Sequence, residues 1–110
     1  MNPKFPLAVL LSILLTSCAT AQSGAMSLAR KAELRGDFHE CLHHLANAES
    51  YGDFAETKNA QIAFQRGMCL EGLGRKSEAL AMYRHVVARY GDSSWAAQAK
   101  GRLESHARPN

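Results

Sequence analysis

Apolar residues recur with the period of an α-helix along much of the chain. From Asp37 onward they fall three or four residues apart, at Phe38, Cys41, Leu42, Leu45 and Ala48. A second stretch from Lys76 repeats this spacing at Ala79, Leu80, Tyr83, Val86, Val87 and Tyr90. Such spacing places the apolar side chains of each stretch on one face and predicts two amphipathic helices.

Each predicted helix follows a glycine that is typical of a tight turn. Gly36 and Gly74 supply backbone freedom that other residues lack. Upstream of them, the pattern predicts partner helices over Ala25 to Arg35 and Thr57 to Leu73. The chain is therefore expected to form two antiparallel helix-turn-helix hairpins.

A last helix is predicted after Ser93 and Ser94, because serine hydroxyls suit the N-cap position. Aromatic residues make up only 7% of the 110-residue chain, which disfavours a fold rich in strands. We therefore expect one all-α domain over residues 26–107, with a capping helix at its C-terminal end.

Residues 63–91 resemble a tetratricopeptide (TPR) repeat. Gly67 takes the small position of its first helix, Ala79 the small crossing point of its second, and Tyr83 the large residue beside that point. Gly101 follows Gly67 at the roughly 34-residue period of the family. The resemblance implies about two repeats plus the capping helix.

The N-terminus carries Lys4 and then a mostly apolar run from Phe5 to Leu15. This run is too short to cross a bilayer, which takes about 20 apolar residues, and is typical of a secretory signal. The sequence Leu15-Thr16-Ser17-Cys18 that ends it resembles the lipobox of bacterial lipoproteins. We expect a signal peptide over residues 1–17 and a lipidated, flexible tether over residues 18–25.

The lipobox resemblance implies that the Cys18 sulfur receives diacylglycerol and that the new amino terminus is acylated, for example with palmitate. In the enteric pattern an Asp after the cysteine retains the protein in the inner membrane, whereas this chain has Ala19. We expect a lipid anchor in the cell outer membrane, with the domain facing the periplasm.

One short segment, His39-Glu40-Cys41-Leu42-His43, matches the H-E-x-x-H pattern of zinc peptidases. Its histidines fall on the polar side of their predicted helix, so we expect a solvated face and no metal site. A surface zinc or copper site at His39, His43 and His44 is an alternative, as is a metallopeptidase.

Cys41 and Cys69 remain once Cys18 is lipidated, and an exported protein can form disulfides. The sequence leaves two interpretations open, a disulfide between them or two buried small residues.

In the TPR family the first helices of successive repeats line a groove that receives a peptide. Projecting that register onto this chain gives a partner-binding groove of Arg30, Glu33, Gln61, Phe64, Met68, Glu71, Trp95, Gln98 and Arg102. Phe64, Met68 and Trp95 would grip an apolar anchor, or would instead pack between adjacent helices.

The net charge of +3 is too small for a nucleic-acid-binding surface, and no catalytic motif or cofactor-binding loop accompanies it. We therefore expect no enzyme and no cofactor. The expected function is a protein–protein interaction adaptor of an envelope assembly, secretion or pilus system. Alternatives are a metal-binding or hydrolytic lipoprotein and a lipoprotein immunity protein. Because two repeats are marginally stable alone, a homo-oligomer is also expected.

Overall fold

A computed structural model describes residues 6–52 and 55–108, apart from the side chains of residues 14–17 and 19. Within this part the chain forms no strand and five helices, which are α1 (Leu7–Leu34), α2 (Phe38–Glu49), α3 (Glu56–Gly72), α4 (Lys76–Arg89) and α5 (Ser94–Ala107). The prediction of an all-α fold is confirmed.

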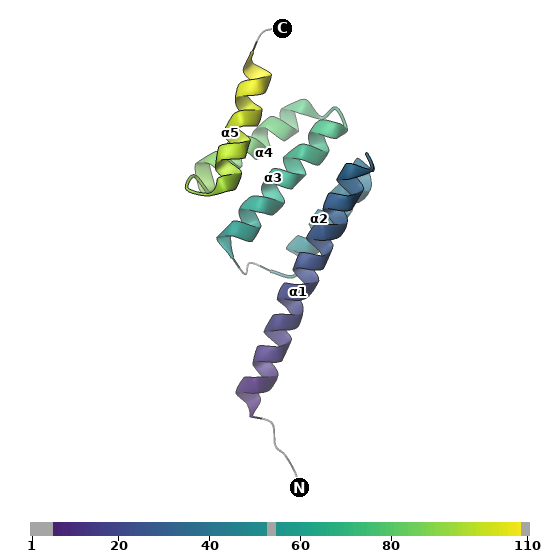
Figure 1. Cartoon of the computed structure of the whole chain (residues 1–110), viewed down its shortest axis with the longest axis vertical. Coiled ribbons are helices and arrows are strands. Elements are labelled where there is room, and N and C mark those ends of the chain that lie inside the picture. The colour runs from purple at the N-terminus through teal and green to yellow at the C-terminus, as the bar shows by residue number, and fades with distance from the viewer. Residues whose placement is uncertain (1–5, 53–54, 109–110) are drawn as a thin grey trace.

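The helices are arranged as two antiparallel hairpins and a closing helix (Figure 1). Helix α1 packs against α2, and α3 packs against α4. The hairpins meet mainly through α2 and α3, and α5 lies against α4 and α3. This is a TPR-like array of about two repeats plus a capping helix, as predicted.

The two hairpin turns share one geometry, and it requires glycine. Gly36 and Gly74 both have φ of 78°, in the left-handed region. At the first turn the N–H of Asp37 donates to the carbonyl of Ala32 at 2.8 Å, and the N–H of Gly36 donates to that of Glu33 at 2.9 Å. The second turn repeats both hydrogen bonds. These bonds satisfy helix-end carbonyls and reverse the chain.

The predicted apolar faces form two buried clusters. The first contains Cys41 and Leu45 of α2, which are fully buried against α1. The second contains Tyr83 and Val86 of α4, which are fully buried against α3 and α5. Leu42 packs against both clusters and so connects the hairpins.

The start of the first helix differs from the prediction. We expected a flexible tether over 18–25 and a helix from Ala25, but α1 is continuous from Leu7. Gln22 is 1% exposed, and its Nε2 donates to the carbonyl of Gly52 at 3.0 Å. The polar residues of the expected tether have no helical periodicity, and this stretch is held by contacts with the distant end of α2.

The first part of α1 projects away from the hairpins (Figure 1). Its apolar side chains, including Leu7 and Leu11, are exposed, as is Cys18. Residues 1–5 of the expected signal peptide and the side chains of residues 15–17 of the lipobox lie outside the described part. Across residues 6–52 and 55–108, no helix has the length and apolar character that crossing a membrane would require.

Candidate functional site

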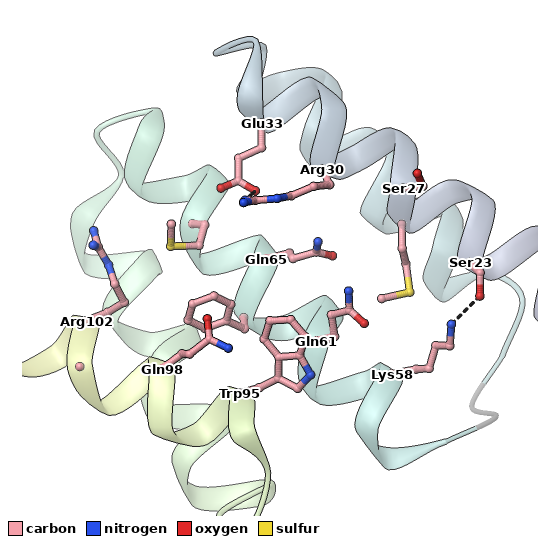
Figure 2. Close-up of a pocket in the computed structure, with 14 residues that line it drawn as sticks. Ser23, Ser27, Arg30, Glu33, Lys58, Gln61, Gln65, Trp95, Gln98 and Arg102 are labelled. Carbon is pink, nitrogen blue, oxygen red and sulfur yellow. Dashed lines mark hydrogen bonds and ion pairs between the residues drawn. The ribbon is translucent and has the colours of Figure 1, made fainter.

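Three helices line a cavity of about 820 Å³ (Figure 2). They are α1, α3 and α5, the first helices of the two hairpins and the closing helix. The lining residues are Ser23, Met26, Ser27, Arg30 and Glu33 of α1, Lys58, Gln61, Phe64, Gln65 and Met68 of α3, and Trp95, Gln98, Gly101 and Arg102 of α5. On each helix they recur every three or four residues, with one adjacent pair per helix, so that one face of each helix borders the cavity.

The structure brings most of the predicted groove residues together on this cavity. Those that line it are Arg30, Glu33, Gln61, Phe64, Met68, Trp95, Gln98 and Arg102. Glu71 does not line it and instead lies behind the wall, where it binds Arg102. Eight of the nine residues expected from the TPR register therefore border one cavity, and Glu71, the last of them on α3, does not.

Sequence reasoning missed six lining residues, Ser23, Met26, Ser27, Lys58, Gln65 and Gly101. Continuing the same helical stripe along each helix would have found most of them. Ser23 falls within the expected tether over 18–25, whereas in the structure it lies on α1 and lines the cavity.

The floor of the cavity is an aromatic cluster. Phe64 is 7% exposed, and its ring centroid lies 5.6 Å from that of Tyr83 and 5.6 Å from that of Trp95. Phe64 thus packs mainly between helices, whereas Met68 and Trp95 are half-buried and present apolar surface to the cavity. The sequence left open whether Phe64, Met68 and Trp95 pack between helices or contact a ligand. Phe64 packs between helices, whereas Met68 and Trp95 keep apolar surface at the cavity.

The charged residues of the wall carry a positive excess. The lining residues include three cations, Arg30, Lys58 and Arg102, and one carboxylate, that of Glu33. Arg30 Nη1 lies 2.8 Å from a carboxylate oxygen of Glu33, and Arg102 pairs with Glu71 behind the wall. Lys58 donates to the hydroxyl of Ser23 and forms no ion pair with a described carboxylate.

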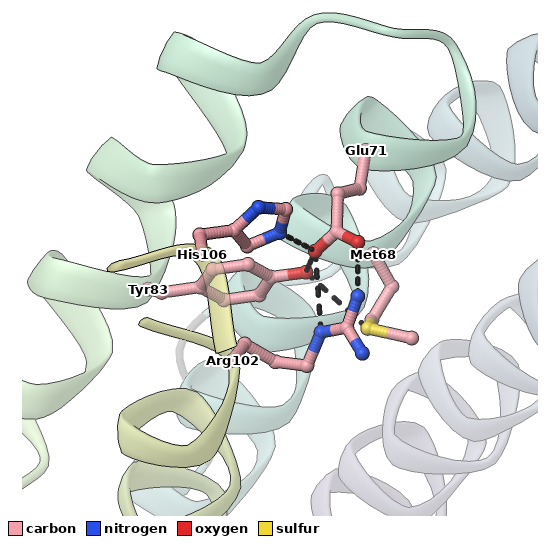
Figure 3. A network of polar contacts seen from close by, with 5 residues as sticks. All are labelled: Met68, Glu71, Tyr83, Arg102 and His106. Atoms are coloured by element: carbon pink, nitrogen blue, oxygen red, sulfur yellow. Dashed lines mark hydrogen bonds and ion pairs between the residues drawn. The ribbon is translucent and has the colours of Figure 1, made fainter. Parts of the chain in front are cut away.

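A polar network fixes Arg102 at the end of the cavity (Figure 3). Its Nε donates to Glu71 Oε1 at 3.2 Å, the hydroxyl of Tyr83 donates to the same oxygen at 2.7 Å, and His106 Nε2 lies 3.2 Å away. Burial alone would raise the pKa of Glu71, but hydrogen bonds from Arg102 and Tyr83, with His106 beside them, hold it below its usual value. Burial and the neighbouring carboxylate raise the pKa of Tyr83.

Gln65 is the buried polar residue of the cavity wall. Its side chain is 6% exposed, and its Oε1 has no hydrogen-bond partner among the described residues. Figure 2 shows the amide pointing from α3 into the space between α1 and α5. An unpaired buried amide oxygen of this kind costs about 1–3 kcal/mol. Gln22 Oε1, outside the cavity, is in the same state.

The histidines of the H-E-x-x-H segment do not converge. His39 and His43 are exposed on α2, and His44 Nε2 lies 3.4 Å from Glu40 Oε1 on the same helix. In the part of the chain that the structure describes, no group of three or more His, Cys, Asp or Glu side chains is placed to hold a metal ion.

Cys41 and Cys69 form a disulfide in the structure, with Cα atoms 6.4 Å apart. The bond joins α2 to α3 and therefore links the two hairpins covalently. Of the two interpretations that the sequence left open, the structure selects the bridge.

These features together form a concave site with an apolar floor, a polar wall and a positive excess. Such a surface suits binding of a chain segment by side-chain packing and hydrogen bonds. A comparison of the chain with known protein families, with curated proteins and with solved structures found no match.

Proposed function

We propose that the chain is an outer-membrane lipoprotein whose helical domain faces the periplasm and binds a protein partner of the cell envelope. In this proposal the domain acts as an adaptor and carries out no reaction. The observation that carries it is the cavity between α1, α3 and α5, where eight of the nine residues expected from the TPR register lie together.

The composition of the cavity suits a protein segment as its occupant. Met68 and Trp95 offer half-buried apolar surface, and aromatic and methionine side chains are enriched where proteins meet. Gln61 and Gln98 add amides that can both donate and accept hydrogen bonds. An apolar side chain and the polar backbone beside it would both find complementary groups here.

The proposed anchor would hold this cavity near the membrane. Cys18 is exposed on α1, one helical turn before the buried Gln22. At 1.5 Å of rise per residue, the lipidated sulfur would lie about 6 Å along the helix from the folded domain. Cleavage before Cys18 would also remove exposed apolar residues such as Leu7 and Leu11. The proposal therefore places an adaptor directly on the membrane surface.

The test blocks the cavity without disturbing the core. A Cβ built on Gly101 meets no atom within 4 Å, so Gly101→Trp adds bulk at the cavity wall without a backbone clash. Ala81→Trp is the matched control, because Ala81 is exposed on α4 and does not line the cavity. Both variants are compared with the unmodified chain by affinity capture from crosslinked membranes, after circular dichroism confirms equal helicity.

We expect a partner that the unmodified chain and Ala81→Trp both capture and that Gly101→Trp loses. Equal capture by all three chains, or the absence of any partner, would overturn the proposed use of the cavity.

A further inference from the structure

The side-chain amide of Gln65 does not connect elements of the fold by hydrogen bonds. It makes no side-chain hydrogen bond with another described residue, although its side chain is 6% exposed. Gln22, which is 1% exposed, shares the unpaired Oε1 but differs at its nitrogen, because its Nε2 donates to the carbonyls of Ala48 and Gly52, at 3.3 and 3.0 Å. Gln22 therefore ties α1 to the end of α2, whereas Gln65 only presents its amide to the cavity.

A molecule that fills the cavity can supply the hydrogen-bond donor that Gln65 Oε1 lacks in the described structure. Such a donor would satisfy a buried polar atom that is costly to leave unpaired. Main-chain N–H groups are donors that every peptide segment carries, whatever its side chains. A peptide unit also offers a carbonyl, so that it complements the Gln65 amide in both of its flipped orientations.

The neighbouring amides favour an extended segment. Gln61 lies one turn before Gln65 on α3, and Gln98 borders the cavity from α5 (Figure 2). In a helical segment most N–H groups are already bonded within the helix, whereas an extended segment leaves them available. Three amides around one cavity therefore suit an extended main chain.

The positive charge of the cavity wall favours an acidic side chain in that segment. Arg30 and Arg102 are each held by a carboxylate, Glu33 and Glu71 respectively. Lys58 has only the hydroxyl of Ser23 as a described partner. A carboxylate of the ligand would complement Lys58, while an apolar side chain would pack on Met68 and Trp95.

We propose that the cavity binds an extended peptide segment that carries an apolar anchor and an acidic side chain, with one main-chain N–H donated to Gln65 Oε1 and the acid placed at Lys58. This inference rests on the proposed function and adds the chemistry of the ligand to it.

The test uses the full chain, purified in detergent, and an array of nonapeptides with a central Leu or Phe between acidic, neutral or basic flanks. Binding is measured by fluorescence anisotropy. In the tightest binder each amide is then replaced, one at a time, by an ester, which removes a single N–H. The same series is measured on Gln65→Met, which keeps the length of the side chain, and on Gln22→Met as the matched control outside the cavity.

We expect acidic flanks to bind more tightly than basic flanks. One ester should weaken binding about tenfold to the unmodified chain and to Gln22→Met, but less than about twofold to Gln65→Met. Denaturation of the free chains gives a second measurement. Gln65→Met should raise the midpoint because it removes an unpaired oxygen and no hydrogen bond. Gln22→Met should lower it because the two hydrogen bonds that it removes outweigh its own unpaired oxygen.

Two results would overturn the inference, and they differ in what they say about the proposed function. If acidic peptides bind but the same ester weakens the unmodified chain and Gln65→Met equally, Gln65 is not the acceptor, and peptide binding by the cavity stands. If no peptide of the array binds, or if basic flanks are preferred, the ligand chemistry is wrong. The proposed function is then decided separately, by whether Gly101→Trp still loses its captured partner.

Discussion

The ring of Tyr83 on α4 lies directly against the backbone of α3 at Gly67. A Cβ placed on Gly67 would fall 2.5 Å from Cε1 of Tyr83, closer than a carbon side-chain atom can lie. Tyr83 is fully buried, and its hydroxyl reaches past this point to donate to Glu71 at 2.7 Å. The absence of a side chain at Gly67 thus places both the aromatic floor of the cavity and the network behind it.

Replacing Gly67 with alanine should therefore destabilise the domain. Alanine favours the helix interior by about 1 kcal/mol over glycine, but forcing the Tyr83 ring aside costs more, and we expect a net loss of about 1–3 kcal/mol. Gly101→Ala is the matched control, because nothing lies within 4 Å of its added Cβ, and it should be neutral or stabilising. Urea denaturation of both variants measures the difference, and equal stabilities would contradict the close approach.

The disulfide between the hairpins gives a second prediction. Cys41 and Cys69 are separated by 28 residues, and closing a loop of this size in the unfolded chain stabilises the fold by about 3–4 kcal/mol. Reduction, or Cys69→Ala, should lower the free energy of unfolding by that order while leaving most of the helix content. Denaturation with and without reductant tests this, after mass spectrometry of the exported chain confirms the bond. Identical curves would show that the bond does not contribute.

The sequence predicts those parts of the fold that depend on residues close to one another along the chain. The glycines at 36 and 74 and the apolar stripes of α2 and α4 are local features, and they place both hairpins correctly. The register of the cavity followed from the same periodicity, because residues three or four apart on a helix share a face.

The features that were missed depend on contacts between distant residues. Gln22 is buried where the carbonyl of Ala48 in α2 and that of Gly52 just after α2 accept from it, and no pattern within residues 18–25 indicates this. Glu71 leaves the cavity because Tyr83 and Arg102 hold its carboxylate behind the wall. The unpaired amide of Gln65 is likewise defined by what surrounds it in space and not by its neighbours in sequence.

The network around Glu71 predicts a dependence of stability on pH. Its pKa in the folded chain lies below its usual value of 4.5, so its ionised form stabilises the fold at pH values above 4.5. This contribution is lost as the pH falls through the lowered pKa. Glu71→Gln should cost about 1–3 kcal/mol at neutral pH, and the difference from the unmodified chain should shrink progressively below pH 4.5.

The control for this experiment is Glu104→Gln, which removes the same charge from an exposed position on α5. Its stability should follow that of the unmodified chain over the whole acid range. Thermal unfolding at a series of pH values measures both variants, and a pH-independent deficit in Glu71→Gln would contradict the role of the ionised carboxylate.

The proposed lipid anchor predicts two changes in localisation. Cys18→Ser should abolish incorporation of labelled palmitate, because the oxygen of serine does not replace the nucleophilic thiolate, and the chain should leave the outer-membrane fraction. Ala19→Asp should keep the label but shift the protein to the inner membrane. Gradient separation of the two membranes measures this, and label retained in Cys18→Ser would contradict the anchor.

The central claim is that a protein partner occupies the cavity, and site-specific photocrosslinking in living cells tests it most directly. A benzophenone amino acid is placed at Gln98, which is exposed at the cavity, or at Lys100, which is exposed on the same helix but does not line the cavity. We predict that irradiation crosslinks a partner to the Gln98 probe and not to the Lys100 probe. The same adduct from both positions, or from neither, would contradict binding at the cavity.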